Sequence, residues 1–148
     1  MWFTNNNFNE IKSSLDYEFK SKTDSEVVLA SYINWGAECV NFFNGMFAFA
    51  IWDNHERKIF LARDRLGIKP LYYHQTNNAF LFSSEIRSLL STNLIEKNLS
   101  SSGLIEYLKY QTVNSPNTIL DKIHMLEPGT YMYYDRDHNI VKNSYWYP

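Results

Sequence analysis

The densest group of side chains that could bind or polarise a ligand lies in the stretch ARDRLGIKPLYY, residues 62–73. Three basic residues and one acid fall within this stretch before Pro70, and strongly apolar runs flank them on both sides. Gly67 and Lys69 suggest a phosphate loop, but the glycine run and the following helix that cradle a phosphate are missing. We therefore expect the loop to brace two strands rather than to perform a reaction. Its signature residues are Arg63, Asp64, Gly67 and Lys69.

Cysteine and histidine provide the other common nucleophiles and metal ligands. Cys39 is the single thiol, no histidine lies near it in sequence, and a free cysteine is most often a small buried apolar residue. We expect Cys39 to be buried and unreactive, although a histidine distant in sequence could still approach it. The four histidines show no ligand spacing, so we expect surface positions and no metal site: His55, His74, His124 and His138.

Asp24 stands near the start of the best-defined helix in the sequence, TDSEVVLASYINWG. Thr23 and Glu26 have the spacing of a capping box, and the helix dipole favours an acid in the first turn. Gly36 is a natural helix terminator. On spacing alone, Asp24 is explained by its effect on the helix, without any ligand. The apolar face of this helix should hold Val28, Leu29, Tyr32 and Ile33.

Apolar runs bounded by turn residues predict β-strands in the middle and at the end of the chain. The run around Phe47 places large residues on one face and alanines on the other, which indicates a strand covered on both sides. The strands between 47 and 82 predict one antiparallel meander, and flanking helices complete a layered α+β domain. The expected strands are 17–20, 47–51, 58–62, 71–74, 79–82, 131–134 and 140–147. Further helices should carry Phe8, Ile11 and Leu15; Ile86, Leu89 and Leu90; and, from Ser100 onward, Leu104, Ile105 and Leu108.

The composition is that of one globular domain over residues 1–148. A net charge of -2 without a basic stripe argues against a nucleic-acid partner. No apolar run approaches the roughly 18 residues of a membrane helix, and the first residues lack the regions of a signal peptide. A single cysteine fits a reducing compartment. We expect a cytoplasmic protein with no nucleic-acid and no membrane partner.

Five motifs, taken in order, make the chain recognisable. They are TDSEVVLASYINWGAECV, NGMFAFAIWD, LARDRLGIKPLYY, FSSEIRSLL and MLEPGTYMYY. Together they resemble the glutaminase domain of glutamine-dependent asparagine synthetase, a class II glutamine amidotransferase, from about Phe8 to Tyr147. The resemblance implies the αββα four-layer sandwich of the N-terminal-nucleophile hydrolases, with part of the N-terminal strands missing.

The resemblance also implies roles for matched residues. An aspartate that opens a helix in the family contacts the polar head of bound glutamine, and Asp24 stands at that position. Its carboxylate would pair with the α-ammonium group of glutamine. The Arg63–Lys69 loop also matches the family's signature, without a matched catalytic role. We expect ion pairs that fix this loop, or a surface that faces an adjoining synthetase domain.

One departure from the family concerns the nucleophile. The family uses a cysteine just after the initiator Met, whose free α-amino group acts as general base. Here Trp2 follows Met1, and neither the family's glutamine-clamping arginine nor its oxyanion-hole motif has a match. The interpretation is a domain whose first several dozen residues are absent, which alone does not hydrolyse glutamine. The complete family member passes ammonia to a synthetase domain that uses ATP and Mg²⁺; no cofactor is expected in this domain.

Two alternatives remain open for the sequence. The chain could be a non-catalytic interaction or regulatory module on the same scaffold. It could also be a fragment of a β-lactam synthetase-like relative, in which the glutaminase cysteine is missing. A sandwich without its N-terminal strands would expose sheet edges, so self-association through the exposed sheet is a further expectation.

Overall fold

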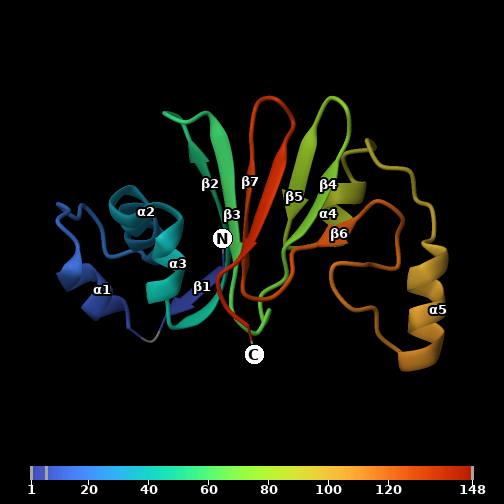
Figure 1. Cartoon of the computed structure of the whole chain (residues 1–148), viewed down its shortest axis with the longest axis horizontal. Coiled ribbons are helices and arrows are strands. Elements are labelled where there is room, and N and C mark those ends of the chain that lie inside the picture. Colours follow the sequence, from blue (N-terminus) through green and yellow to red (C-terminus); the bar gives the residue numbers. More distant parts are fainter. Residues whose placement is uncertain (1, 6, 148) are drawn as a thin grey trace. The chain divides into compact units, whose positions relative to one another are not determined.

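The computed structural model describes residues 2–5 and 7–147, with the side chains of 7–147 (Figure 1). The chain forms two compact units. The first extends to Lys69 and resumes at Pro128, and the second runs from Pro70 to Glu127. Each unit has its own β-sheet.

The first unit is built on a five-stranded antiparallel sheet with strand order β1-β2-β3-β7-β8. A tight turn at residues 54–57 joins β2 to β3, and Ala50 pairs with Leu61 across this hairpin. The strands are β1 (Trp2–Asn5), β2 (Gly45–Asp53), β3 (Lys58–Arg63), β7 (Thr130–Tyr134) and β8 (Ile140–Ser144).

Helices cover one face of this sheet, as Figure 1 shows. They are α1 (Phe8–Ser14), α2 (Asp24–Trp35) and α3 (Cys39–Phe42), with a 3₁₀ turn at Gly36–Glu38. The aromatic rings of Phe43, Phe47, Phe49 and Phe60 form the centre of the core, with centroids 5.5–6.0 Å apart between successive members. Phe43, at the end of α3, packs edge-to-face on Phe47 and Phe49 and so holds this helix end against β2.

The opposite face of the same sheet is buried as well. Ala48, Leu61 and Met132 are 4%, 0% and 0% exposed. The alternation of large and small residues in β2 therefore predicted two-sided burial correctly, because neither face carries the polar residues of a solvated strand.

The second unit contains a three-stranded antiparallel sheet with order β5-β4-β6. Leu89, Ile95 and Ile123 form a small core beside it. Its elements are β4 (Tyr72–Gln75), β5 (Phe80–Ser83), α4 (Ile86–Leu90), α5 (Ser101–Tyr110) and β6 (His124–Met125). Ser100 caps α5 as expected, since its Oγ accepts a hydrogen bond from the Gly103 N–H at 3.1 Å.

The expected single meander is wrong at one point. β3 pairs with β7 rather than with β4, and β4 belongs to the other sheet. The chain therefore changes sheets through residues 64–71, which include the charged signature loop. Sequence periodicity identifies strands but not their partners, because pairing is decided by tertiary packing.

The expected strand at 17–20 and the expected capping box are also wrong. Residues 16–23 form no regular element. The Glu26 carboxylate turns back to accept hydrogen bonds from the Lys20 and Ser21 N–H groups and from the Ser21 hydroxyl. It is therefore engaged by the preceding loop, and Thr23 is the N-cap without a side-chain cap hydrogen bond.

The apolar faces of two helices differ from the expected ones. In α2, Val27, Val28 and Ser31 are buried, whereas Leu29 and Ile33 are 42% and 63% exposed. In α5, Leu104, Ile105 and Leu108 are all exposed. Periodicity marks an apolar stripe without showing which neighbour covers it, and α5 packs instead through Gly103.

Candidate functional site

The signature loop is organised around the carboxylate of Asp64, which is 1% exposed. Oδ1 accepts a hydrogen bond from the Ile68 N–H at 2.9 Å, and Oδ2 accepts from the N–H groups of Lys69 and Phe47 at 3.0 and 3.2 Å. The Asp64 carbonyl accepts from Gly67 and from Gly129 at 3.0 and 2.9 Å. A buried carboxylate with this many donors is stabilised by charge-assisted hydrogen bonds. Through its carboxylate and its carbonyl, Asp64 ties three chain segments together.

Arg63 binds the other side of the same loop. Its Nε donates to the Lys69 carbonyl at 2.8 Å and its Nη2 to the Gly67 carbonyl at 2.6 Å. The Arg63 carbonyl in turn accepts from the Tyr145 hydroxyl at 2.7 Å. Burial, followed by the nearby negative charge of Asp64, raises the pKa of Tyr145 above its usual range, so the phenol remains a donor. Main-chain groups thus hydrogen-bond the charged side chains of both Arg63 and Asp64.

Two glycines allow the loop to close. Gly67 has φ +64°, and a Cβ there would lie 2.8 Å from Pro128 Cγ. Gly129 has φ +61°, and its Cβ would meet the Trp146 carbonyl at 2.7 Å. Only glycine fits both demands at low cost. The four signature residues are therefore brought together as one compact polar structure.

Asp24 is the first residue of α2 and is exposed. Within the described residues, no hydrogen bond or ion pair of its carboxylate is found. The loop before it is fixed by Glu26, whose pKa is lowered first by the hydrogen bond from the Ser21 hydroxyl and then by that from the Lys20 N–H. The arrangement presents a carboxylate to solvent from a well-anchored helix terminus.

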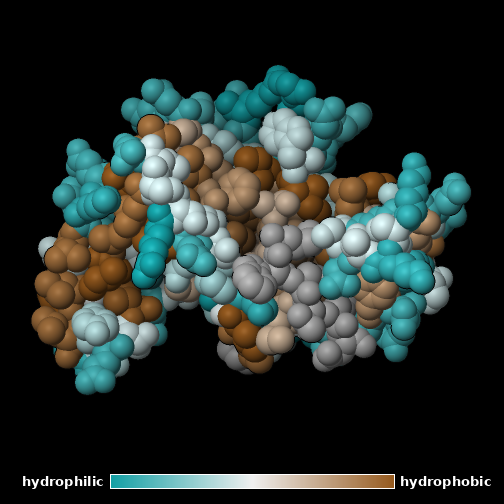
Figure 2. All heavy atoms as spheres, turned by 180° about the vertical axis from the view of Figure 1, so that it is seen from behind, coloured by the Kyte–Doolittle hydropathy of each residue, from teal (hydrophilic) through white to brown (hydrophobic). Residues whose placement is uncertain are grey.

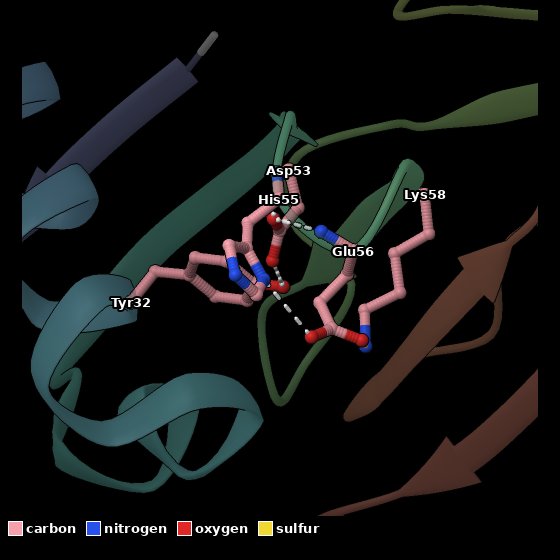
Figure 3. Close-up of polar contacts among 5 residues, drawn as sticks. All are labelled: Tyr32, Asp53, His55, Glu56 and Lys58. Carbon is pink, nitrogen blue, oxygen red and sulfur yellow. Dashed lines mark hydrogen bonds and ion pairs between the residues drawn. The ribbon is translucent and has the colours of Figure 1, made fainter.

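A second polar group lies at the other end of α2, beside the β2–β3 hairpin (Figure 3). The Tyr32 hydroxyl donates to Asp53 Oδ2 at 3.1 Å, while Oδ1 accepts from the His55 and Glu56 N–H groups at 3.0 and 2.9 Å. These hydrogen bonds, that from Glu56 foremost, lower the pKa of Asp53. Burial raises the pKa of Tyr32 above its usual range, so the pair is a neutral phenol and a carboxylate at neutral pH.

A pocket of about 400 Å³ adjoins this group. Lys58 lines it, with Nζ 3.9 Å from Glu56 Oε2 and 4.3 Å from the centre of the Tyr133 ring. The polar groups here bind one another, and the Asp53 contacts are those of a side chain that closes a turn. The pocket follows the second half of α2 and does not include Asp24. We regard it as a structural element of the hairpin.

Cys39 is fully buried at the start of α3. Burial raises the pKa of its thiol to about 12, so the thiolate that nucleophilic attack requires is scarce at neutral pH. The expectation of a buried core cysteine is confirmed.

The histidines only partly follow the sequence expectation. His55 is exposed in the hairpin turn, but His74 is 4% exposed, so the expected surface position of His74 is wrong. Among the described residues, no three His, Cys, Asp or Glu side chains lie close enough to hold a metal ion. Within the same residues, no helix has both the length and the apolar character needed to cross a bilayer.

Sequence reasoning identified the signature loop and Asp24 but did not bring them together. Asp24 belongs to α2, whereas Asp64 lies beyond β3, and no contact between them is found in the described part of the chain. Sequence reasoning missed the Tyr32–Asp53 pair, because 21 residues separate the partners and they belong to two different motifs. It also missed the pocket that His74 lines.

Comparison with known families gives a match over nearly the entire chain. The sequence pattern of the family called Glutamine amidotransferase domain matches residues 5–146. The chain is 36% identical over 143 residues to a Methanocaldococcus jannaschii protein named Putative asparagine synthetase [glutamine-hydrolyzing] 2, covering 95% of this chain and 28% of that protein. It is 38% identical over 122 residues to Asparagine synthetase [glutamine-hydrolyzing] 3 of Bacillus subtilis, covering 82% and 20%. The chain thus spans only 20–28% of the length of these curated relatives.

Solved structures agree on the fold. A glutamine phosphoribosylpyrophosphate (PRPP) amidotransferase from B. subtilis superposes with a TM-score of 0.67 at 16% identity, over 96% of this chain and 27% of that one. This likeness shows the N-terminal-nucleophile hydrolase fold, as the motifs predicted. Together with the match over residues 5–146, it establishes that the chain belongs to the glutamine amidotransferase domain family.

Proposed function

We propose that this chain serves as the glutamine-binding domain of an asparagine synthetase-like protein, in which glutamine supplies the ammonia for asparagine synthesis. The observation that carries the proposal is the family match over residues 5–146, together with relatives named glutamine-hydrolysing asparagine synthetases at 36% and 38% identity. Within this proposal, the synthetase part of a longer protein consumes the ammonia.

Asp24 supplies the contact with glutamine in this proposal. Its carboxylate is exposed, and the loop before it is held by Glu26, so a ligand's α-ammonium group meets it without a competing protein cation in the described residues. A charge-assisted hydrogen bond of this kind is worth about 1.5–3 kcal/mol. The signature loop acts only as scaffold, since the Arg63 and Asp64 side chains hydrogen-bond main-chain groups of the loop and its neighbours.

The proposal separates binding from turnover. Hydrolysis of a carboxamide requires a nucleophile, and Cys39 is the single thiol of the sequence and is buried. We therefore expect the 148-residue chain to bind L-glutamine but to release no ammonia from it.

The test combines calorimetry with an ammonia assay on the same preparation. Saturable binding of L-glutamine, weaker binding of D-glutamine and no ammonia release support the proposal. A folded chain that binds neither enantiomer contradicts it and favours the non-catalytic interaction module. Ammonia release that disappears in Cys39→Ser contradicts the assignment of Cys39 to the core.

A further inference from the structure

The loop before α2 is joined to the first turn of this helix through the carboxylate of Glu26. Oε1 accepts a hydrogen bond from the Lys20 N–H at 2.8 Å. Oε2 accepts from the Ser21 N–H at 2.6 Å and from the Ser21 hydroxyl at 2.5 Å. Because two successive main-chain N–H groups donate to one carboxylate, these charge-assisted hydrogen bonds hold the backbone of the loop and not only a side chain.

These hydrogen bonds close a ring of chain that contains Asp24. The backbone from Ser21 to Glu26 forms the ring, and the Glu26 side chain closes it. Inside the ring, the Ser21 and Thr23 hydroxyl oxygens lie 2.9 Å apart, and the Glu26 N–H donates to the Thr23 carbonyl at 3.2 Å. Asp24 therefore cannot leave the helix start unless this ring opens.

The chain that leads into the ring is anchored as well. Tyr17 and Phe19 pack against the core, with their ring centroids 4.9 Å apart. Lys12 of α1 places its Nζ 4.5 Å from the centre of the Phe19 ring. Hydrogen bonds, that from the Ser21 hydroxyl foremost, lower the pKa of Glu26, so its carboxylate is ionised at neutral pH. The loop is thus held before and after residue 20.

The ring provides a restraint that the helix otherwise lacks. Helix ends fray, and an N-cap side chain commonly limits the fraying by accepting a hydrogen bond from the first turn. Thr23 is the N-cap of α2 but makes no such hydrogen bond. The exposed Asp24 follows directly, so its backbone is restrained by the Glu26 ring instead. A ligand that binds an already ordered residue avoids the entropic cost of ordering it.

We propose that Glu26 is a positioning residue for the glutamine contact, because it holds Asp24 where the Asp24 carboxylate meets the α-ammonium group of the ligand. Glu26 itself does not touch the ligand, since both of its oxygens accept from Lys20 and Ser21. This role rests on the proposed function, in which Asp24 binds glutamine. It adds that the effect of Glu26 is limited to the ammonium end of the ligand.

A double-mutant cycle measured with L-glutamine tests this role. Glu26→Gln should weaken binding about fivefold or more, because the amide NH₂ cannot accept from the loop and the helix start must be ordered on binding. In the Asp24→Asn background, the same substitution should change the affinity by less than about twofold. Equal losses in the two backgrounds would show that Glu26 does not act through Asp24 and would overturn the proposal.

A ligand without the ammonium group separates positioning from a general structural effect. The probe is 4-carbamoylbutanoate, which is glutamine without its α-ammonium group. Glu26→Gln should leave its affinity within about twofold of that of the unmodified chain, whereas a general loss of structure weakens both ligands alike. The matched control Glu10→Gln removes the same charge from the exposed face of α1 and should change neither affinity.

Hydrogen exchange of the Lys20 and Ser21 amides reads the ring without any ligand. Both amides should exchange faster in Glu26→Gln, and Ser21→Ala, which removes one donor and keeps both main-chain hydrogen bonds, should show a smaller change. Unchanged exchange in Glu26→Gln overturns the positioning role even if glutamine binds. An unmodified chain that protects both amides but binds no L-glutamine contradicts the proposed function, and the role of Glu26 falls with it.

Discussion

At the scale of single residues, Asp64 shows how a charge can belong to a protein core. Three main-chain N–H groups converge on its carboxylate. The carboxylate therefore gives these buried donors the acceptor that water would otherwise have to provide. The charged stretch between two apolar runs is thereby explained as a buried connector rather than a reactive loop.

Replacement of Asp64 by asparagine should destabilise the first unit by about 1–3 kcal/mol, because the amide NH₂ cannot accept and leaves buried N–H groups unpaired. Urea unfolding monitored by tryptophan fluorescence measures the change. The exposed variant Asp137→Asn is the matched control and should leave the midpoint in place. An unchanged midpoint in Asp64→Asn would show that the loop is not organised by this carboxylate.

Asp53 should make stability depend on pH on the acid side. Its pKa is lowered in the folded chain, so the stabilisation it provides is present above the unfolded value of about 3.9 and is lost as the pH falls through the folded pKa. Asp53→Asn should therefore show a smaller loss of unfolding free energy between pH 7 and pH 3 than the unmodified chain. Equal losses of unfolding free energy in the two proteins would show that Asp53 does not cause the pH dependence.

At the scale of elements, the sequence predicted which segments form helices and strands better than it predicted their neighbours. The helix that ends at Gly36, the hairpin at 47–62 and the final hairpin are all present, since periodicity, turn residues and caps act locally. The assignment of β4 to a second sheet was not predictable from the same signals, because the sequence of a β-strand does not specify which strand it pairs with. The pocket beside His74 was missed for a related reason: its residues come from segments nearly fifty positions apart.

Gly103 is the residue through which α5 packs. A Cβ there would lie 2.4 Å from the Thr118 carbonyl oxygen, which is closer than real Cβ atoms approach backbone. Gly103→Ala should therefore destabilise the second unit by about 1–3 kcal/mol, although alanine is the better helix former. Hydrogen exchange of the α5 amides reports the change, with the exposed Ser102→Ala as control. Increased protection in Gly103→Ala would contradict the close approach.

At the scale of the whole molecule, exposed apolar surface is the main feature that the proposed binding function leaves unexplained. The expected self-association through sheet edges stays a prediction, and Lys142 on the edge strand β8 is a residue type that opposes edge pairing. The exposed side chains of α5 form a second apolar surface, seen as brown spheres over this helix in Figure 2.

Self-association should therefore depend on α5 more than on β8. Leu108 is 74% exposed, and Leu108→Glu should reduce the association seen in sedimentation velocity at high concentration without lowering the thermal midpoint. Ser102→Glu adds the same charge away from the apolar face and should have little effect. A chain that sediments as a monomer at every concentration would contradict the prediction.

Glutamine is proposed to bind at the first turn of α2, and an NMR titration of the labelled chain with L-glutamine measures this binding directly. We predict shifts that centre on the amides of residues 23–26 and an affinity that falls about tenfold or more in Asp24→Asn, while Asp16→Asn binds as the unmodified chain does. Shifts centred elsewhere, or an affinity unchanged by Asp24→Asn, would contradict glutamine binding at Asp24.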